Sequence, residues 1–442
     1  MFAALVLAAA TIATPAPMTL AQAIDFASTH NQQVLAAKAQ WVEAGASLAR
    51  DRSAQLPNVQ ALAQNTMTRQ TVINTGQFNQ INQPYFSQNT AQVQASQSLF
   101  NFGNELVANQ ARHSYDAAAQ NLRLVKEQMV INVETAFYGY VQNLQLADLA
   151  RSDLAYQQTL YEISDASYRA GRVAGIDRLK AQVQRTSSEE SLASAIADAE
   201  DSRENLAQTI GADVGQQFAV PASIPVPKVA TVDQKALDAI AAAHRPDLAI
   251  ARDDLSNAVL ANGLVDAPNR PIVSLQGAVG NQAIPTNIGQ NIQPPPPAGF
   301  GCNAPYCLPT HFYSIGINSQ LTLPLIDWGT LRSAHNGAKA TIVSQTAAFQ
   351  AAERQAVIDV DQALRRVKVD DQNLTLAVQN ASVAKQTAQI AQLQYKVGLG
   401  SQLDVTSAEQ TYLQAAKQLL AAQVGFVLSA DKLKLATGTL VD

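Results

Sequence analysis

The two cysteines are the most reactive side chains in this sequence, and they stand close together. Cys302 and Cys307 are separated by four residues, with Pro305 among them. A proline turn of this length lets the two Cβ atoms approach, and cysteines of exported proteins are usually paired. We therefore expect a disulfide between Cys302 and Cys307. Free thiols are one alternative, and a metal site is another, although two thiols with only His311 nearby make a poor set of ligands.

The other side chains that could bind a metal or carry catalysis are scattered. No two histidines stand four residues apart, and none pairs with a cysteine in a recognised ligand pattern; they are His30, His113, His244, His311 and His335. The sequence also lacks a nucleophile elbow, a phosphate-binding loop and a zinc-protease motif. We therefore expect no metal, no cofactor and no enzymatic activity.

One motif, Tyr-x-x-Gly-x5-Asp, occurs twice with the same spacing. Its copies are Tyr168, Gly171 and Asp177, then Tyr395, Gly398 and Asp404. Glycine can adopt the left-handed conformation that ends a helix. In the second copy Ser401 and Asp404 also match a capping box, which would start the next helix. Each copy therefore predicts the tip of a helical hairpin.

Long segments of helical pattern surround both tips. Asn104 to Ser167 predicts a helix of about 95 Å, whereas the return segment from Ile176 to about Ile210 is only about half that length. Met18 to Arg52 also has a helical pattern and stops before Pro57. We expect this helix and the return helix to stack end to end beside the long one.

The second half of the sequence repeats the first. The distance along the chain from Asn31 to Arg245 equals the distance from Pro57 to Pro271. We therefore expect an internally duplicated protein. Its predicted segments are a signal peptide (1–17), a first repeat (18–210), a Gly/Pro-rich linker (211–231) and a second repeat (232–442).

Each repeat also contains a pair of alternating segments that predicts a strand hairpin. Val59 onward and Ala91 to Leu99 form the first pair, and alternation from Ser314 to Leu325 marks the second. Aromatic residues bracket these strands, as in the girdles of membrane barrels: Tyr85, Phe86, Phe100, Phe102, Phe312, Tyr313 and Trp328. A soluble sandwich would show the same alternation, but the aromatics and the attached long helices favour a barrel in lipid. Four strands cannot close a barrel with a lumen, so the protomer is predicted to oligomerise.

Composition and charge narrow the class of protein further. Charged residues make up 15% and aromatics 6%, with a formal net charge of −5. Without a lysine or arginine block, no nucleic-acid partner is expected. Residues 2–13 form an apolar segment too short to span a membrane, and Ala-Thr-Pro-Ala-Pro follows. This pattern is typical of a signal peptide that lacks a basic start, and a plain hydrophobic tail is the alternative.

A resemblance to a known family rests on both tips, the repeated order of elements, and the segments Leu403–Val405 and Ala436–Leu440. On these features the chain resembles the TolC, or outer membrane efflux protein, family. The resemblance extends from about Met18 to Leu440. It implies a homotrimer whose 12 strands form one β-barrel in outer-membrane lipid of a Gram-negative-type cell. It also implies a periplasmic α-barrel of long antiparallel helical hairpins.

The function implied by the resemblance is an exit duct for small molecules or drugs. Its partners would be a periplasmic adaptor and an inner-membrane pump of the resistance-nodulation-division or ABC type. A duct for type I protein secretion or for heavy metals would have the same architecture, and the substrate is not readable from the sequence. The family places the two tips at the periplasmic mouth, where adaptor hairpins engage. The alternative is that the Gly and Asp residues of the two tips only end and cap helices.

Overall fold

The computed structural model describes residues 17–68, 71–74, 79–82, 86–221, 223–227, 233–283, 310–322, 324–397 and 399–441. The chain divides into two compact units, and each unit draws on both halves of the sequence. The helical unit comprises Met1–Trp41, Ala117–Arg252 and Ala347–Asp442; the sheet unit comprises Val42–Asp116 and Asp253–Thr346. Apart from Pro17, the expected signal peptide lies outside the described residues, as do Tyr85, Gly398 and both cysteines.

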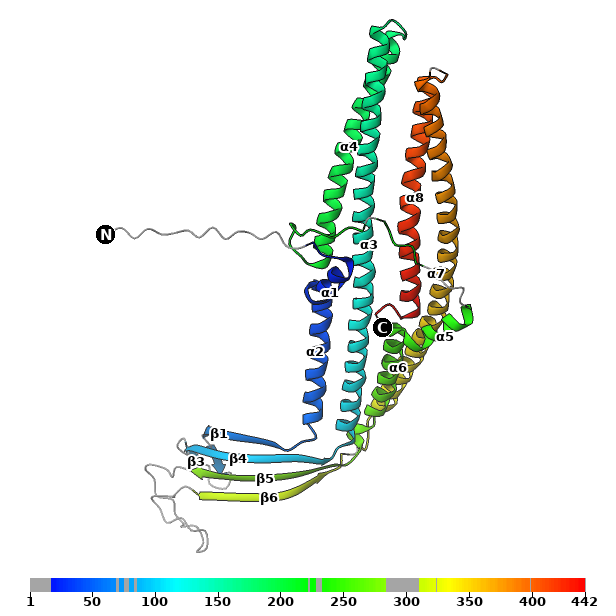
Figure 1. Ribbon diagram of the computed structural model, residues 1–442. Helices are drawn as coiled ribbons and strands as arrows, with labels where there is room; N and C mark the ends of the chain where they lie inside the picture. The colour runs from blue at the N-terminus through cyan, green and yellow to red at the C-terminus, as the bar shows by residue number, and fades with distance from the viewer. Residues whose placement is uncertain are drawn as a thin grey trace, which may run out of the picture. The chain divides into compact units, whose positions relative to one another are not determined.

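Two very long helices and their shorter partners form the predicted hairpins (Figure 1). Helix α3 (Phe102–Arg169) has 68 residues and α7 (Thr330–Lys396) has 67, so each is about 100 Å long. Each is followed across a tip by a helix of 36 residues, α4 (Gly175–Ile210) or α8 (Gln402–Thr437). The prediction of two long helical hairpins is confirmed.

The single helix expected from Met18 to Arg52 is wrong, because the structure has two helices there. Helix α1 (Leu20–His30) and α2 (Gln32–Ser53) are separated by Asn31, whose ψ of 128° is extended. The side-chain oxygen of Asn31 accepts hydrogen bonds from the backbone N–H groups of Gln33 and Val34, at 2.9 and 3.3 Å. Asn31 therefore caps a new helix instead of continuing the old one.

The second half has the same break. Helix α5 (Gln234–His244) ends at Arg245, whose ψ is 123°, and α6 (Pro246–Leu264) begins with proline. Proline disfavours the helical conformation in the residue before it and suits the first position of a helix. A short 3₁₀ turn (η1, Ala267–Asn269) follows α6.

The shorter helices meet end to end, as the sequence predicts. Helix α4 ends at Gly211, which has φ 78° and lies so close to the α1–α2 junction that an added Cβ would be 2.8 Å from the carbonyl oxygen of His30. Helix α8 ends at Gly438, with φ 71°, and an added Cβ there would be 2.8 Å from the carbonyl oxygen of His244. Only glycine fits either junction.

The main hydrophobic core of the helical unit surrounds the middle of α3. Residues from α1, the start of α2, the end of α4, the segment after it and α8 pack against this part of α3; the largest fully buried members are Phe137, Leu206, Ile210, Val34, Val133 and Val141. Phe218, in the segment after α4, packs edge-on against Tyr140 with ring centroids 6.1 Å apart. Away from this core, α7 and α8 share smaller clusters, one of them around Ala381, Ala384 and Ala415.

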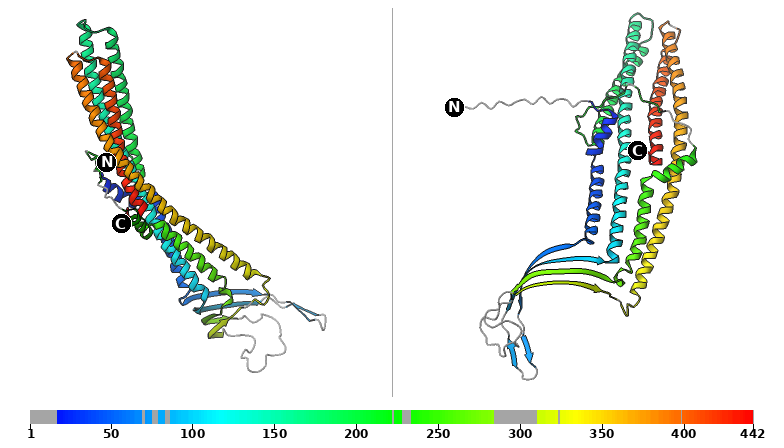
Figure 2. Two further views of the ribbon diagram at one scale, coloured as in Figure 1. Left: turned by 90° about the vertical axis from the view of Figure 1, so that its right-hand side faces the viewer. Right: turned by 60° about the horizontal axis from the view of Figure 1, so that its bottom comes forward.

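The sheet unit contains four antiparallel strands in the order β1-β4-β5-β6 (Figure 2). These are β1 (Asn58–Thr68), β4 (Phe86–Phe100), β5 (Ile272–Ala283) and β6 (Thr310–Gln320). A separate pair, β2 (Thr71–Asn74) and β3 (Asn79–Asn82), lies between β1 and β4 in sequence. Both predicted hairpins are present, and β4 pairs with β5 to join them. The alternation expected to run to Leu325 ends early, because β6 stops at Gln320.

Candidate functional site

The first hairpin tip is closed by Gly171, whose φ of 70° is left-handed. Its N–H donates to the carbonyl oxygen of Tyr168 at 2.9 Å, and Arg172 N–H donates to Ser167 at 2.9 Å. An added Cβ at Gly171 would meet no atom within 4 Å. Glycine is therefore required at this tip because of the left-handed backbone conformation, and not because a larger side chain would lack room.

Tyr168 links the end of α3 to the start of α4. The guanidinium carbon of Arg178 lies 5.5 Å from the centre of the Tyr168 ring, a cation–π contact. Asp165 forms ion pairs with Arg169 at 2.8 Å and with Arg178 at 3.7 Å. The first tip is thus held by side chains, whereas Ala174, the N-cap residue of α4, makes no side-chain capping hydrogen bond.

The second tip has the predicted capping box. Asp404 N–H donates to Ser401 Oγ at 3.2 Å, and Ser401 N–H and Oγ donate to Asp404 Oδ2 at 3.1 and 2.6 Å. These hydrogen bonds from Ser401 lower the pKa of the Asp404 carboxyl. Asp404 therefore has a structural role at the start of α8, which was one of the two interpretations of this residue.

A groove of about 750 Å³ lies between the two tips. Of the predicted tip residues, Asp177 and Tyr395 line it, whereas Tyr168, Gly171 and Asp404 are not among its lining residues. Its apolar members are Val173, Ile176, Leu179, Val183 and Leu403. Ile176 and Leu403 are 57% and 76% exposed. These residues were not predicted from the sequence, although Ile176, Leu179 and Val183 recur at helical spacing.

Two buried carboxyl groups lie near this groove, and they too were not predicted from the sequence. Asp153 on α3 accepts hydrogen bonds from Ser188 Oγ at 2.6 Å and from the Gln157 amide at 3.2 Å. Glu409 on α8 accepts one from the Gln392 amide at 3.3 Å. Burial, and then the charge of Asp153, raise the pKa of Glu409. The carboxyl groups of the two hairpins therefore interact electrostatically.

The strand register brings apolar residues of all four strands to one face of the sheet. One row across the sheet is Ala61, Val93, Val279 and Tyr313, and the next is Val59, Ala95, Gly277 and Ile315. Alternate rows are largely polar, such as Gln60, Gln94, Ala278 and Ser314. Tyr313 and Ile315 are 90% and 89% exposed. A broad exposed apolar face of this kind marks contact with lipid or with another protein.

The predicted interface aromatics are placed as follows. Phe86 and Phe100 are the first and last residues of β4, and Phe312 and Tyr313 lie in β6. Trp328 is 93% exposed in the turn before α7. Phe102 begins α3, and its ring lies 4.9 Å from the guanidinium carbon of Arg270.

The described part of the chain offers no alternative site for metal chemistry. In that part, no group of three or more His, Cys, Asp or Glu side chains is arranged to hold a metal ion. None of the described helices is both long and apolar enough to cross a membrane.

Comparison with known proteins identifies the family. Nodulation protein T of Rhizobium leguminosarum bv. trifolii is 22% identical over 344 residues, which cover 76% of this chain and 69% of the relative. The CmeC outer membrane channel of Campylobacter jejuni shares the fold, with a TM-score of 0.76, 18% identity, and coverage of 95% of this chain and 86% of CmeC. The outer membrane protein VceC of Vibrio cholerae also shares it, with a TM-score of 0.75, 18% identity, and coverage of 95% and 96%. The profile of the outer membrane efflux protein family matches residues 23–212 and 239–439. Because that profile spans most of both halves, the chain belongs to the outer membrane efflux protein family, whose members are outer-membrane channels and not enzymes.

Proposed function

We propose that this protein is the exit duct of a tripartite efflux pump and passes small molecules or drugs to the outside. The observation that carries the proposal is the apolar face of the open four-stranded sheet in a chain of this family. A sheet with one apolar and one polar face suits a barrel wall with lipid outside and water inside. The long helical hairpins would extend into the periplasm.

The open sheet supports a homotrimer. Among the described strands, β1 and β6 are the edges of the sheet, because each pairs with one neighbour only. Unpaired backbone groups at a strand edge are not tolerated in lipid. Pairing of β1 in one protomer with β6 in the next would remove both edges, and three copies would give a 12-stranded barrel wide enough for a channel.

Internal duplication accounts for the paired features of the helical unit. Gly211 and Gly438 have the same left-handed conformation at matching helix ends. The separation of these two glycines along the chain equals that of the tip residues Tyr168 and Tyr395. The family profile also matches each half once. We therefore infer that one ancestral unit was duplicated.

The tips are the proposed docking surface for a periplasmic adaptor, which would connect the duct to an inner-membrane pump. Both tips expose apolar side chains at their ends, including Ile176, Leu399 and Leu403. Such residues suit contact with an amphipathic helical hairpin. Because Gly171 has no cap Ser after it and Ser401 caps the second tip, three protomers would present two kinds of docking groove.

Ion conductance in a planar lipid bilayer tests the proposed function. We expect the purified protein to be trimeric in mild detergent. On insertion into the bilayer it should give discrete, long-lived steps in the current. A correctly folded, membrane-inserted trimer that conducts no ions at any voltage would rule out a duct. Drug susceptibility of a strain lacking the gene, with and without complementation, then tests efflux.

A further inference from the structure

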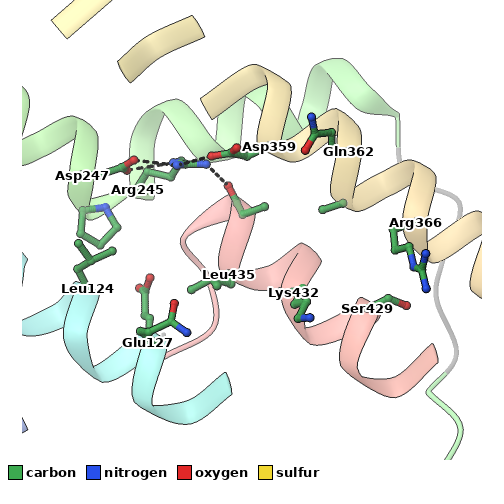
Figure 3. Close-up of a pocket in the computed structure, with 14 residues that line it drawn as sticks. Leu124, Glu127, Arg245, Asp247, Asp359, Gln362, Arg366, Ser429, Lys432 and Leu435 are labelled. Carbon is green, nitrogen blue, oxygen red and sulfur yellow. Dashed lines mark hydrogen bonds and ion pairs between the residues drawn. The ribbon is translucent and has the colours of Figure 1, made fainter. Parts of the chain in front are cut away.

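Two hollows occupy matching places in the two halves of the helical unit. The first has about 780 Å³ and lies where the end of α4 meets the start of α2 beside α3. The second has about 450 Å³ and lies where the end of α8 meets the start of α6 beside α7, with α3 as a further wall (Figure 3). Asn132 and Asn205 line the first, and their counterparts in the second half of the chain, Asp359 and Lys432, line the second.

The two hollows differ systematically in charge. Residues without charge line the first hollow, and charged residues replace several of them at the matching positions of the second. In pairs of matching positions, first hollow before second, these are Asn31 and Arg245, Gln33 and Asp247, Asn132 and Asp359, Gly139 and Arg366, and Asn205 and Lys432. We call the first the amide hollow and the second the charged hollow. Because their linings differ at five matching positions, we expect the two hollows to bind different solutes.

The amide hollow presents free hydrogen-bonding groups and no ionisable side chain. Its polar lining residues are Asn31, Gln32, Gln33, Asn132, Thr135, Asn143, Ser202, Asn205, Gln208 and Thr209. The amide of Asn31 is used at the helix junction. The amides of Gln32, Gln33, Asn205 and Gln208 make no hydrogen bond to any residue that the structure describes, and each offers both a donor and an acceptor.

In the charged hollow most of the charges are already paired. Arg245 donates to Asp247 at 2.7 Å, to Asp359 at 2.9 Å and to the carbonyl oxygen of Ala436 at 3.2 Å, as Figure 3 shows. Arg366 forms an ion pair with Asp370 at 2.9 Å. A neutral solute that entered this hollow would displace water from charged groups. Because the solute carries no opposite charge to replace that hydration, its binding there would be unfavourable. The amide hollow has no such cost.

Both hollows open on the side of the helices that faces away from Ile224. Gly139 lines the amide hollow, and Asp148 lies near Ile224; nine residues apart on α3, they project about 180° apart. On α8, Lys432 lines the charged hollow and Gln423 lies near Ile224, and they project about 180° apart. Three copies of the segment 218–224 and of α1 would obstruct the inside of a helical tube, so these elements belong outside. The hollows then face the lumen, a step that rests on the proposed duct.

We propose that the amide hollow is a binding site in the duct wall for neutral solutes rich in hydroxyl or amide groups, and that the charged hollow does not share this specificity. Uncharged amides can donate to and accept from such a solute without requiring a charge on it. Each of these hydrogen bonds replaces one to water, so the net gain is small. The expected affinity is in the millimolar range, which lets solutes bind and leave quickly along the duct. Three amide hollows would alternate with three charged hollows around the lumen.

Calorimetric titration of the full-length protein in detergent tests the site directly. Maltohexaose serves as a neutral, hydroxyl-rich probe, and hexagalacturonate serves as a probe of equal length with a carboxylate on each sugar. We expect maltohexaose to bind in the millimolar range and hexagalacturonate to bind at least about tenfold more weakly. No heat from maltohexaose, or equal binding of both probes, would overturn the proposal.

Variants that exchange residues between the hollows locate the site. Asn205→Lys and Gln208→Leu introduce residues of the charged hollow, and each should weaken maltohexaose binding about tenfold. The matched control, Lys432→Asn, makes the reverse change in the charged hollow and should leave binding unchanged. Equal binding by wild type and both first variants would contradict the assignment. If the protein conducts ions but binds no maltohexaose, the site is wrong and the duct stands; binding without conductance would reject the duct instead.

Discussion

The side-chain amide of Asn31 donates to the carbonyl oxygen of Thr209 across 2.8 Å, although the two residues are 178 positions apart. The same amide caps α2 through its oxygen. Asn31 thus starts one helix while holding the end of another. In the second half, Arg245 takes this place by donating to the carbonyl oxygen of Ala436 at 3.2 Å.

Loss of this link should destabilise the helical unit. We expect Asn31→Ala to lower the free energy of unfolding by about 1–2 kcal/mol, because a cap and a half-buried hydrogen bond are both lost. Thermal melting followed by circular dichroism at the helix band measures the effect. Gln32→Ala is the control, since Gln32 is exposed and bonds to no described residue; equal melting of the two variants would contradict this role for Asn31.

Strain at a tip should weaken adaptor docking without dissociating the trimer. A β-branched residue at Gly171 must adopt a φ near 70°, which costs about 1–2 kcal/mol and distorts the turn. We expect Gly171→Val to recover less adaptor in a pulldown, while native mass measurement still finds a trimer. Gly398→Val should act likewise at the second tip. Unchanged adaptor recovery in both variants would show that docking does not depend on these turns.

Glu134 should make stability depend on pH. Burial, and then the charge of Asp431, raise the pKa of its carboxyl from 4.5 to about 7, against the opposing charge of Lys434. The folded state therefore holds this proton more tightly than the unfolded state, and the free energy of unfolding falls as the pH rises from 4.5 to about 7.

Glu134→Gln should remove this dependence and stabilise the protein by up to about 3 kcal/mol at pH 8, with little effect at pH 4. Denaturant titrations of wild type and variant at several pH values measure the difference. Glu189→Gln, on an exposed surface of α4, is the control and should not alter the pH profile. A constant difference between wild type and Glu134→Gln at all pH values would be inconsistent with the raised pKa.

An apolar stripe on α7 should contact a neighbouring protomer. Val369, Leu376, Val383 and Ile390 recur every seven residues and are exposed in the single chain. This heptad spacing is typical of a helix seam. We expect Leu376→Asp to reduce the trimer fraction in native mass spectra, because it would bury an unpaired charge. Gln379→Asp, on the exposed surface of the same helix, should have little effect; trimers of undiminished abundance in Leu376→Asp would place the seam elsewhere.

The disulfide between Cys302 and Cys307 remains a prediction. Because the bond would close a short loop, its loss should change overall stability little but should make the loop easier to cleave by proteases. Mass spectrometry of a non-reduced digest, after trapping of free thiols, measures it. We expect the peptide with both cysteines to lack the two thiol hydrogens of its reduced form and to carry no trapping label. A trapped, alkylated peptide would establish free thiols.

Local patterns in the sequence determined the tips and the hairpins. Ser401 and Asp404 predict a capping box because a hydroxyl and a carboxylate three residues apart can each bond the other's backbone N–H. The long segments of helical pattern predict α3 and α7, and the alternation from Ser314 predicts β6. All of these depend on residues close together in the chain. The break at Asn31 was missed because an asparagine cap and a helix interior look alike where the helical pattern continues on both sides.

Contacts between distant residues were decided only by the tertiary structure. Pairing of β4 with β5 joins the two halves and sets the register that places Ala61, Val93 and Tyr313 in one apolar row. Asp153 and Glu409 come from different hairpins, so neither sequence pattern shows that they are buried together. The amide hollow likewise requires three helix segments to converge, and the charged hollow requires four. Periodicity indicates which face of an element is apolar, but the partner of that face depends on packing between elements far apart in the chain.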